Sequence, residues 1–343
     1  MQTRLIDDSL RGHFLGVGSV SGPDHETPFR YVMSLKVPYC YQLPSLREED
    51  MIRQFAYLVE GFERDGDYIL DLDMATYQEI VLDSDALLPD EQHAHSLYRM
   101  ARGERKSVCK TQQTAPATMC FSIRSPSGKT MVSADMFRLF SSLMTRVARG
   151  QAELLEQNSE SVILCQDDPA LGFVQEIILK GEAPGLTFDS VLDETENVYP
   201  PSVIPAYHYC SDWRALKHKS RYPLWDGRRK IVHVDLVRYL PPVDEEQCER
   251  INSFLQEGGG IALGVIPNTD EGFRNGVVPT VKQNLRIALK GFRDCGVDTS
   301  LVAENAMVST QCGLVHASAP LVEKIHSLDE SLPSILEKEA SRL

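Results

Sequence analysis

The chain has 343 residues of ordinary globular composition, which is enough to bury a large core. Its net charge of −14 argues against a nucleic-acid partner, because a phosphate backbone is bound by a basic face. No apolar run approaches the ~20 residues of a membrane span, the first ten residues lack the apolar core of a signal peptide, and eight cysteines in so long a chain do not indicate a disulfide framework. We therefore expect a cytoplasmic protein with no membrane partner.

The first third of the sequence predicts two strands and two helices before a long polar excursion. Residues 14–20 form a short apolar run that ends in a Gly-containing turn, and residues 38–43 form a second run. Pro23-Asp24-His25-Glu26 is expected to open a helix that runs to about residue 35, and helical spacing is found at 47–58. Residues 61–116 are polar and irregular, so we expect an insertion between strands 2 and 3.

Beyond this stretch, predicted strands and helices alternate regularly. Strands are expected at 118–123, 161–165, 203–209, 230–237, 261–266 and 301–309, and helices at 133–156, 244–256, 279–294 and beyond 319. Eight strands with intervening helices favour an α/β fold made of a single (β/α)8 TIM barrel over residues 1–343, with 61–116 near its mouth. A doubly wound open sheet is the alternative, although no nucleotide-binding glycine motif supports it.

In such a barrel, chemistry collects where the strands end. Ligand-type side chains at these ends include His208 and Cys210, which share one face of a strand, Asp235 on the next strand, and Cys312 after the last. One imidazole, two thiolates and a carboxylate are the ligands of a zinc site, so we expect these residues to bind Zn2+. The alternative is that His208 and Cys210 are ordinary strand residues and that Cys312 is a buried thiol.

Five short motifs, taken in order, give the chain a family resemblance. They are Val17-Gly18-Ser19, Gln42-Leu43-Pro44 with Glu49-Asp50-Met51-Ile52, Asp167-Asp168-Pro169-Ala170-Leu171, His208-Tyr209-Cys210, and Gln311-Cys312-Gly313-Leu314. In this respect the sequence resembles the catalytic, C-terminal half of cobalamin-independent methionine synthase in its short core form, within the superfamily that includes uroporphyrinogen decarboxylase. The resemblance covers nearly the whole chain.

The resemblance implies zinc bound by His208, Cys210, Cys312 and a carboxylate, with Asp235 standing where the family has Glu. It places four residues at the substrate: Gly18, Ser19, Asp167 and Arg53. Asp167 would bind the amine of the acceptor, whereas Arg53 stands where full-length enzymes have a Glu that helps to hold that amine. The folate-associated half of the family, and the histidine that assists the folate leaving group, have no counterpart in the sequence.

These features predict a zinc-dependent methyltransferase of methionine biosynthesis that methylates a small thiol, with homocysteine as the expected acceptor. A methyl-corrinoid, carried by a corrinoid protein partner, is favoured over methyl-tetrahydrofolate as the donor. Three alternatives stay open: another thiol acceptor such as coenzyme M, a non-catalytic subunit that docks a corrinoid protein, and decarboxylase-like chemistry without a metal. The set of one His and two Cys argues against the last of these.

Overall fold

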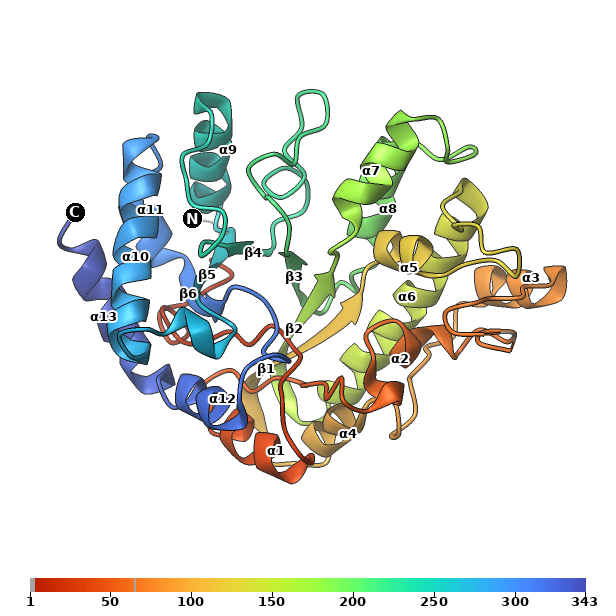
Figure 1. Ribbon diagram of the computed structural model, residues 1–343, viewed down its shortest axis with the longest axis horizontal. Helices are drawn as coiled ribbons and strands as arrows, with labels where there is room; N and C mark the ends of the chain where they lie inside the picture. Colours follow the sequence, from red (N-terminus) through yellow and green to blue (C-terminus); the bar gives the residue numbers. More distant parts are fainter. Residues whose placement is uncertain (1–3, 65) are drawn as a thin grey trace.

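A curled, parallel β-sheet forms the centre of the computed structural model, which describes residues 4–64 and 66–343 (Figure 1). The sheet has six strands in the order β1-β2-β3-β4-β5-β6, and every neighbouring pair is parallel. The strands are β1 (Lys106–Thr114), β2 (Ser159–Asp167), β3 (Ile204–Tyr209), β4 (Ile231–Asp235), β5 (Gly260–Ile266) and β6 (Ala306–Thr310). Because the order of the strands in the sheet follows their order in the chain, each connection joins two neighbouring parallel strands.

Helices cover the outer face of the curl, where a continuous apolar layer packs between them and the strands (Figure 1). The amphipathic helix α6 (Ala134–Leu155), for example, contacts both β1 and β2. The other helices of this second part are α5 (Pro116–Ser122), α7 (Leu171–Leu179), α8 (Phe188–Asn197), α9 (Glu245–Gln256), α10 (Val277–Asp294), α11 (Thr299–Glu304), α12 (Ala319–His326) and α13 (Leu332–Ala340). Within the described ranges, none of the helices is both long enough and apolar enough to cross a membrane.

The inner face of the sheet changes character along the strands. At their amino ends it is apolar, with Val108, Ile163, Ala206, Ile231, Ala262 and Met307 in one buried cluster. Two residues further on, the same face carries polar or titratable side chains on β1, β3 and β4, namely Lys110, His208 and His233, because alternate residues of a strand share a face. Ile6 and Leu10 pack against the apolar end. The polar end of the interior is therefore where a site can form.

The two edges of the sheet are linked by the amino-terminal part of the chain. Phe14 forms an isolated parallel bridge to Val308 of β6, and Tyr39 forms one to Lys110 of β1. A third bridge, between Ser19 and Gln42, joins the two segments to each other. The segments 14–20 and 38–43 thus lie where we expected two strands, but they make single bridges to the sheet instead of extended ladders.

Two sequence predictions in the first half are wrong. Residues 118–122 of the strand expected at 118–123 belong to helix α5, which starts with Pro116 in its first turn, and the strand is instead β1, which precedes this helix in the chain. Since β1 lies within 61–116, the excursion predicted there does not reach residue 116. The single helix expected at 47–58 is broken into the short helices η1 (Arg47–Glu49) and α2 (Arg53–Ala56). The remaining helices before β1 are α1 (Glu26–Met33), α3 (Met74–Leu82) and α4 (His95–Ala101).

Candidate metal centre

His208, Cys210 and Cys312 come together beyond the carboxyl ends of the strands. One ligand atom from each lies within 4.8 Å of the others, and among the described residues they form the one group of three His, Cys, Asp or Glu side chains so closely spaced. The Cys210 Sγ lies 2.9 Å from His208 Nε2, and the Cys312 Sγ lies 3.8 Å from the same nitrogen. Two strand ends that are distant in the sequence therefore contribute to one cluster, as the sequence predicted.

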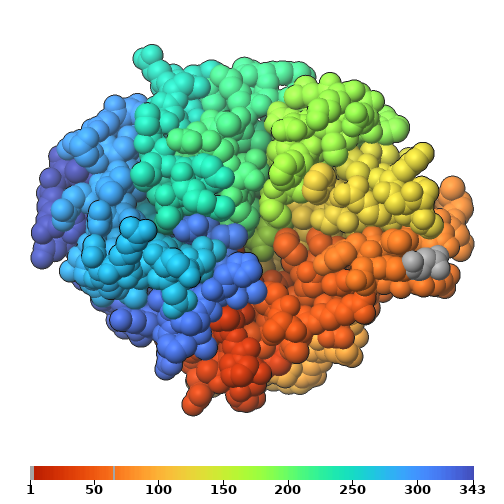
Figure 2. All heavy atoms as spheres, viewed as in Figure 1, coloured from red at the N-terminus to blue at the C-terminus, as the bar shows by residue number. Residues whose placement is uncertain are grey.

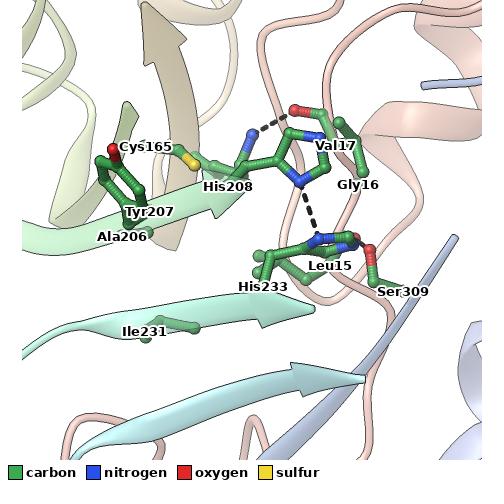
Figure 3. Close-up of a pocket in the computed structure, with 11 residues that line it drawn as sticks. Leu15, Gly16, Val17, Cys165, Ala206, Tyr207, His208, Ile231, His233 and Ser309 are labelled. Atoms are coloured by element: carbon green, nitrogen blue, oxygen red, sulfur yellow. Dashed lines mark hydrogen bonds between the residues drawn. The ribbon is translucent and has the colours of Figure 1, made fainter. Parts of the chain in front are cut away.

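His233, on the neighbouring strand β4, fixes the orientation of His208 (Figure 3). The His233 Nε2 lies 2.8 Å from the carbonyl oxygen of Thr310, which only accepts hydrogen bonds, so this nitrogen carries the proton. The other nitrogen of His233 then accepts from His208 Nδ1, 2.7 Å away. This relay leaves the Nε2 of a neutral His208 without a proton, with its lone pair toward the two sulfurs.

The electrostatics of the group follow from its burial and its internal hydrogen bonds. The hydrogen bond from Cys210 holds the pKa of the Cys312 thiol well below its usual range, while the same bond and burial raise the pKa of Cys210. Burial disfavours a charged His208, but the hydrogen bond and charge of Cys312 outweigh burial and raise the pKa of His208. Burial, together with the nearby His208, holds the pKa of His233 well below its usual range, so His233 stays neutral.

A cavity of about 230 Å³ opens onto this group. Asp167 at the end of β2 and Ser19 also line it, together with Gln42, Pro44, Asp50 and Met51 from the amino-terminal part of the chain. Red-to-orange, green and blue segments meet near the middle of the face seen in Figure 2, which is consistent with a site built from distant parts of the sequence. Burial raises the pKa of Asp167, and no described cation lies within 4 Å of its carboxylate.

Two of the sequence-predicted residues lie outside this cavity lining. Arg53 is turned to Glu63, with its Nε 2.7 Å from the carboxylate, and its guanidinium lies over the ring of Tyr68. Gly18 lies between two lining residues and allows close packing, since a Cβ there would approach the Gln112 side chain to 3.1 Å. Arg53 is therefore not placed to contact a ligand of the metal group.

Asp235 is not part of the metal group either. Its carboxylate accepts hydrogen bonds from the backbone N–H groups of Val237 and Arg238, both at 2.9 Å, and pairs with the Arg238 side chain. Arg238 in turn donates to the carbonyl oxygen of Cys210, at 3.0 Å. Asp235 thus supports the backbone that carries Cys210, instead of offering its oxygens to a metal at the cluster.

Solved structures with a distant likeness to this chain include a methionine synthase and an amidohydrolase. No family model and no curated protein matches the sequence. A B12-independent methionine synthase from Shewanella sp. W3-18-1, solved in complex with selenomethionine, is 19% identical with a TM-score of 0.44, over 68% of this chain and 64% of that chain. An amidohydrolase is 10% identical with a TM-score of 0.31, over 71% of this chain and 62% of that one. The chain thus spans less than two thirds of either structure, and the similarity carries no argument about activity.

A second cavity, of about 400 Å³, adjoins the first and shares Asp50, Met51 and Pro169 with it. Its other walls include Phe121 and Phe173, whose rings stack with centroids 5.3 Å apart. Phe173 is 52% exposed, so part of its ring faces solvent at this wall. The metal group is therefore bordered on one side by a larger, mainly apolar space.

The segment that carries Asp50 and Met51 is held in place by Glu49. This side chain is buried, and its carboxylate accepts a hydrogen bond of 2.7 Å from the backbone N–H of Leu43. Burial raises the pKa of Glu49 to about 7. The walls of both cavities thus depend on a buried carboxyl group that titrates near neutral pH.

The sequence analysis missed His233 and Lys110. His233 lies two residues before Asp235 on the same strand face, so strand alternation would have placed it beside the expected ligands. Lys110 was hidden because its strand was expected elsewhere. Both are fully buried on the inner face of the sheet, where a polar side chain requires a specific partner.

Proposed function

We propose that this chain is a zinc-dependent methyltransferase that transfers a methyl group to a small thiol, with homocysteine as the acceptor and methionine as the product. The observation that carries the proposal is the convergence of one imidazole nitrogen and two sulfurs in a cavity that also contains an unpaired carboxylate. The eight cysteines of the chain are all free, which supports a reducing compartment such as the cytoplasm.

The donor set of His208, Cys210 and Cys312 fits zinc in its catalytic form. Three protein ligands with a fourth, open position are typical of catalytic zinc, and His208 presents an unprotonated nitrogen because His233 holds its other side. Zinc held by these residues would supply a Lewis acid that lowers the pKa of an acceptor thiol. Because the carboxylate of Asp235 is engaged by its own turn and by Arg238, His208, Cys210 and Cys312 would hold the metal without it and would leave a position open to the acceptor.

Asp167 is the residue that we assign to the amine of the acceptor. Its carboxylate lines the same cavity as the metal group and lacks a cationic partner in the described structure, so an ammonium group would satisfy it. A charge-assisted hydrogen bond of this kind contributes about 1.5–3 kcal/mol. An amine-free thiol such as coenzyme M is the alternative acceptor, and it would gain nothing from Asp167.

In the transfer, the acceptor thiol loses its proton to solvent and its sulfur forms a bond to the methyl carbon. The bond between this carbon and the donor breaks, and its electron pair stays with the donor. A methyl-corrinoid, brought by a corrinoid protein, accepts this pair on cobalt without needing a proton. Among the described lining residues of the two cavities, His208 is the sole histidine, so no second imidazole is present to protonate a folate nitrogen. The donor would approach the acceptor sulfur through the second cavity, of about 400 Å³.

We also propose that the complete architecture is a (β/α)8 barrel over the whole chain. The segments 14–20 and 38–43 would take the first two strand positions, and β1 to β6 the remaining six. The bridges from Phe14 to β6 and from Tyr39 to β1 support this arrangement, because they connect both edges of the sheet. An experimental structure in which the edges are unconnected would contradict it.

The function is tested by supplying a labelled methyl group to the metal-loaded protein. We expect purified protein to bind about one zinc per chain and to convert homocysteine to trideuteromethyl methionine with CD3-cobalamin as donor, detected by mass spectrometry. Cys210→Ser and Cys312→Ser should each lose most of the zinc and the activity. Cys295→Ser is the matched control, since this partly buried thiol donates to Phe292 on the outer helix α10 and should change neither.

Other outcomes select among the alternatives. Methylation of coenzyme M but not of homocysteine would agree with the proposed metal site and would make coenzyme M the acceptor. Zinc binding without methylation of any thiol would favour a docking subunit. Full zinc content in both Cys210→Ser and Cys312→Ser would refute the site itself.

A further inference from the structure

Lys110 is a buried lysine without a carboxylate partner. It lies on the inner face of β1 and is 1% exposed. Its Nζ donates to the carbonyl oxygen of Val17 at 2.6 Å and to the side-chain oxygen of Gln112 at 3.0 Å. In the described residues no Asp or Glu oxygen lies within 4 Å of this ammonium group. A buried cation held only by neutral acceptors is costly, so its retention calls for an explanation.

The other buried lysine of the described chain, Lys230, has a different environment. Lys230, just before β4, is also 1% exposed, but its ammonium group pairs with the carboxylate of Glu196 and with backbone carbonyls. The charge of the buried Lys230, which lies away from the metal group, is thus compensated by a carboxylate of the protein itself. Lys110 differs from Lys230 in its location and in having no carboxylate within 4 Å; Asp167 interacts with it electrostatically, without a hydrogen bond.

Lys110 lies near His208 on the inner face of the sheet. It lines a small cavity of about 10 Å³, with room for about one water molecule, together with His208, His233, Cys165 and Ser309. Figure 3 shows these four other residues around the cavity. Val17, which accepts its hydrogen bond, also lines the larger cavity that contains Cys210 and Cys312. The ammonium group therefore borders His208 from the small cavity and does not line the larger cavity that an acceptor would enter.

The position of Lys110 would suit the charge of the site once a metal and an acceptor are bound. With a divalent metal, two thiolates and a neutral imidazole, the metal group has no net charge, and Asp167 adds one negative charge. An ammonium group on the acceptor would pair with Asp167, and the acceptor thiolate would add a further negative charge besides the carboxylate that homocysteine itself carries. Lys110 supplies one positive charge toward this excess of negative charge.

We propose that Lys110 is a positioning residue that acts as the buried counter-ion of the acceptor thiolate, a role that rests on the proposed function. It also holds the segment of Val17 and thereby Ser19 at the cavity wall. A divalent metal brings two positive charges, and the two cysteine thiols release two protons when they bind it. The net charge of the metal group therefore does not change on metal binding, so Lys110 has little effect on metal affinity. Its effect appears when a thiol binds and loses its proton. A unit charge at about 10 Å in a medium of effective dielectric constant about 20 corresponds to a change of about tenfold in affinity.

The test uses cobalt in place of zinc, since binding of a thiolate to cobalt gives a charge-transfer absorption that needs no turnover. Homocysteine is titrated into cobalt-loaded protein between pH 6 and 9. We expect Lys110→Met to bind cobalt at wild-type stoichiometry, to bind homocysteine about tenfold more weakly at pH 7, and to require a pH about one unit higher for half-maximal absorption. Lys230→Met, the matched control, should lower the melting temperature without changing either thiol property.

A second variant covers the case in which Lys110→Met does not fold. Gln112→Glu keeps Lys110 and places a carboxylate at its existing partner, so it should weaken thiol binding in the same direction. Wild-type affinity and pH dependence in a folded Lys110→Met, or in Gln112→Glu if the first variant fails, would overturn the counter-ion role alone. If the wild-type cobalt protein shows no response to any thiol, the proposed function falls and this inference falls with it.

Discussion

Replacing His233 by phenylalanine tests the relay that orients the metal group. The ring size is kept, but the hydrogen bonds to His208 Nδ1, at 2.7 Å, and to the Thr310 carbonyl, at 2.8 Å, are both lost. Each buried polar group left unpaired costs about 1–3 kcal/mol, so we expect a loss of about 2–6 kcal/mol in the free energy of unfolding. The metal affinity should fall by about 10- to 100-fold, as is typical when the partner of a metal-bound histidine is removed.

His326→Phe provides a control of matched chemistry. His326 is also buried and makes two hydrogen bonds, to the Tyr39 hydroxyl at 2.7 Å and to the Val322 carbonyl at 2.6 Å, but it lies on helix α12 and has no contact with the metal group. Denaturant unfolding of the metal-free proteins should show comparable losses of stability for both variants. Competition with a chromophoric chelator should show weakened zinc binding for His233→Phe only. Equal zinc affinity in the two variants would refute the relay.

Three further predictions follow from carboxylates of the structure. Asp167→Asn should weaken binding of homocysteine by about 10- to 100-fold and leave an amine-free thiol of similar length nearly unaffected, as measured by thiol titration of the cobalt protein. Asp235→Asn should retain about one zinc per chain by metal analysis while lowering the melting temperature, because it weakens the turn and the Arg238 pair; loss of zinc would instead support direct ligation. Burial raises the pKa of Glu49 to about 7 from 4.5, so the folded state retains a proton that the unfolded chain releases, and stability should fall as pH rises between these values. Glu49→Gln should flatten this fall by up to about 3 kcal/mol between pH 4.5 and 8 in denaturant titrations, and an unchanged slope would contradict the assignment.

Most strands of the second half could be located from sequence because each is a short, continuous apolar run between helices. The exception is the strand expected at 301–309, whose first residues belong to helix α11, so that β6 begins only at Ala306. The predicted 203–209 and 261–266 differ from β3 and β5 by one residue at their starts. β1 could not be located in this way, since its inner face contains Lys110 and Gln112 and lacks the apolar pattern of a strand. The apolar stretch after it was mistaken for the strand, although Pro116 is well placed to begin a helix.

The candidate site was predictable where the spacing of residues determines geometry. His208 and Cys210 share a strand face, and Cys312 follows a parallel strand, so their convergence follows from the topology. Asp235 shares the inner face with His233, but its carboxylate is bound by the N–H groups of its own turn, and sequence does not show such local competition. The contacts of Arg53 with Glu63 and Tyr68 could not be predicted for a similar reason, because these two residues lie in a segment whose path the sequence does not show.

The single bridges between the amino-terminal segments and the sheet make this seam the least strongly hydrogen-bonded part of the curl. Fewer ladder hydrogen bonds imply a lower free energy of local opening than in β2 to β5, and thus faster amide exchange at Leu15, Val20 and Cys40 than in the strand interiors. Ser19 and Gln42 belong to the seam and also line the 230 Å³ cavity. Breathing of the seam would widen this cavity without disturbing the strand that carries His208, so the rate at which ligands enter and leave can change independently of the geometry that binds them.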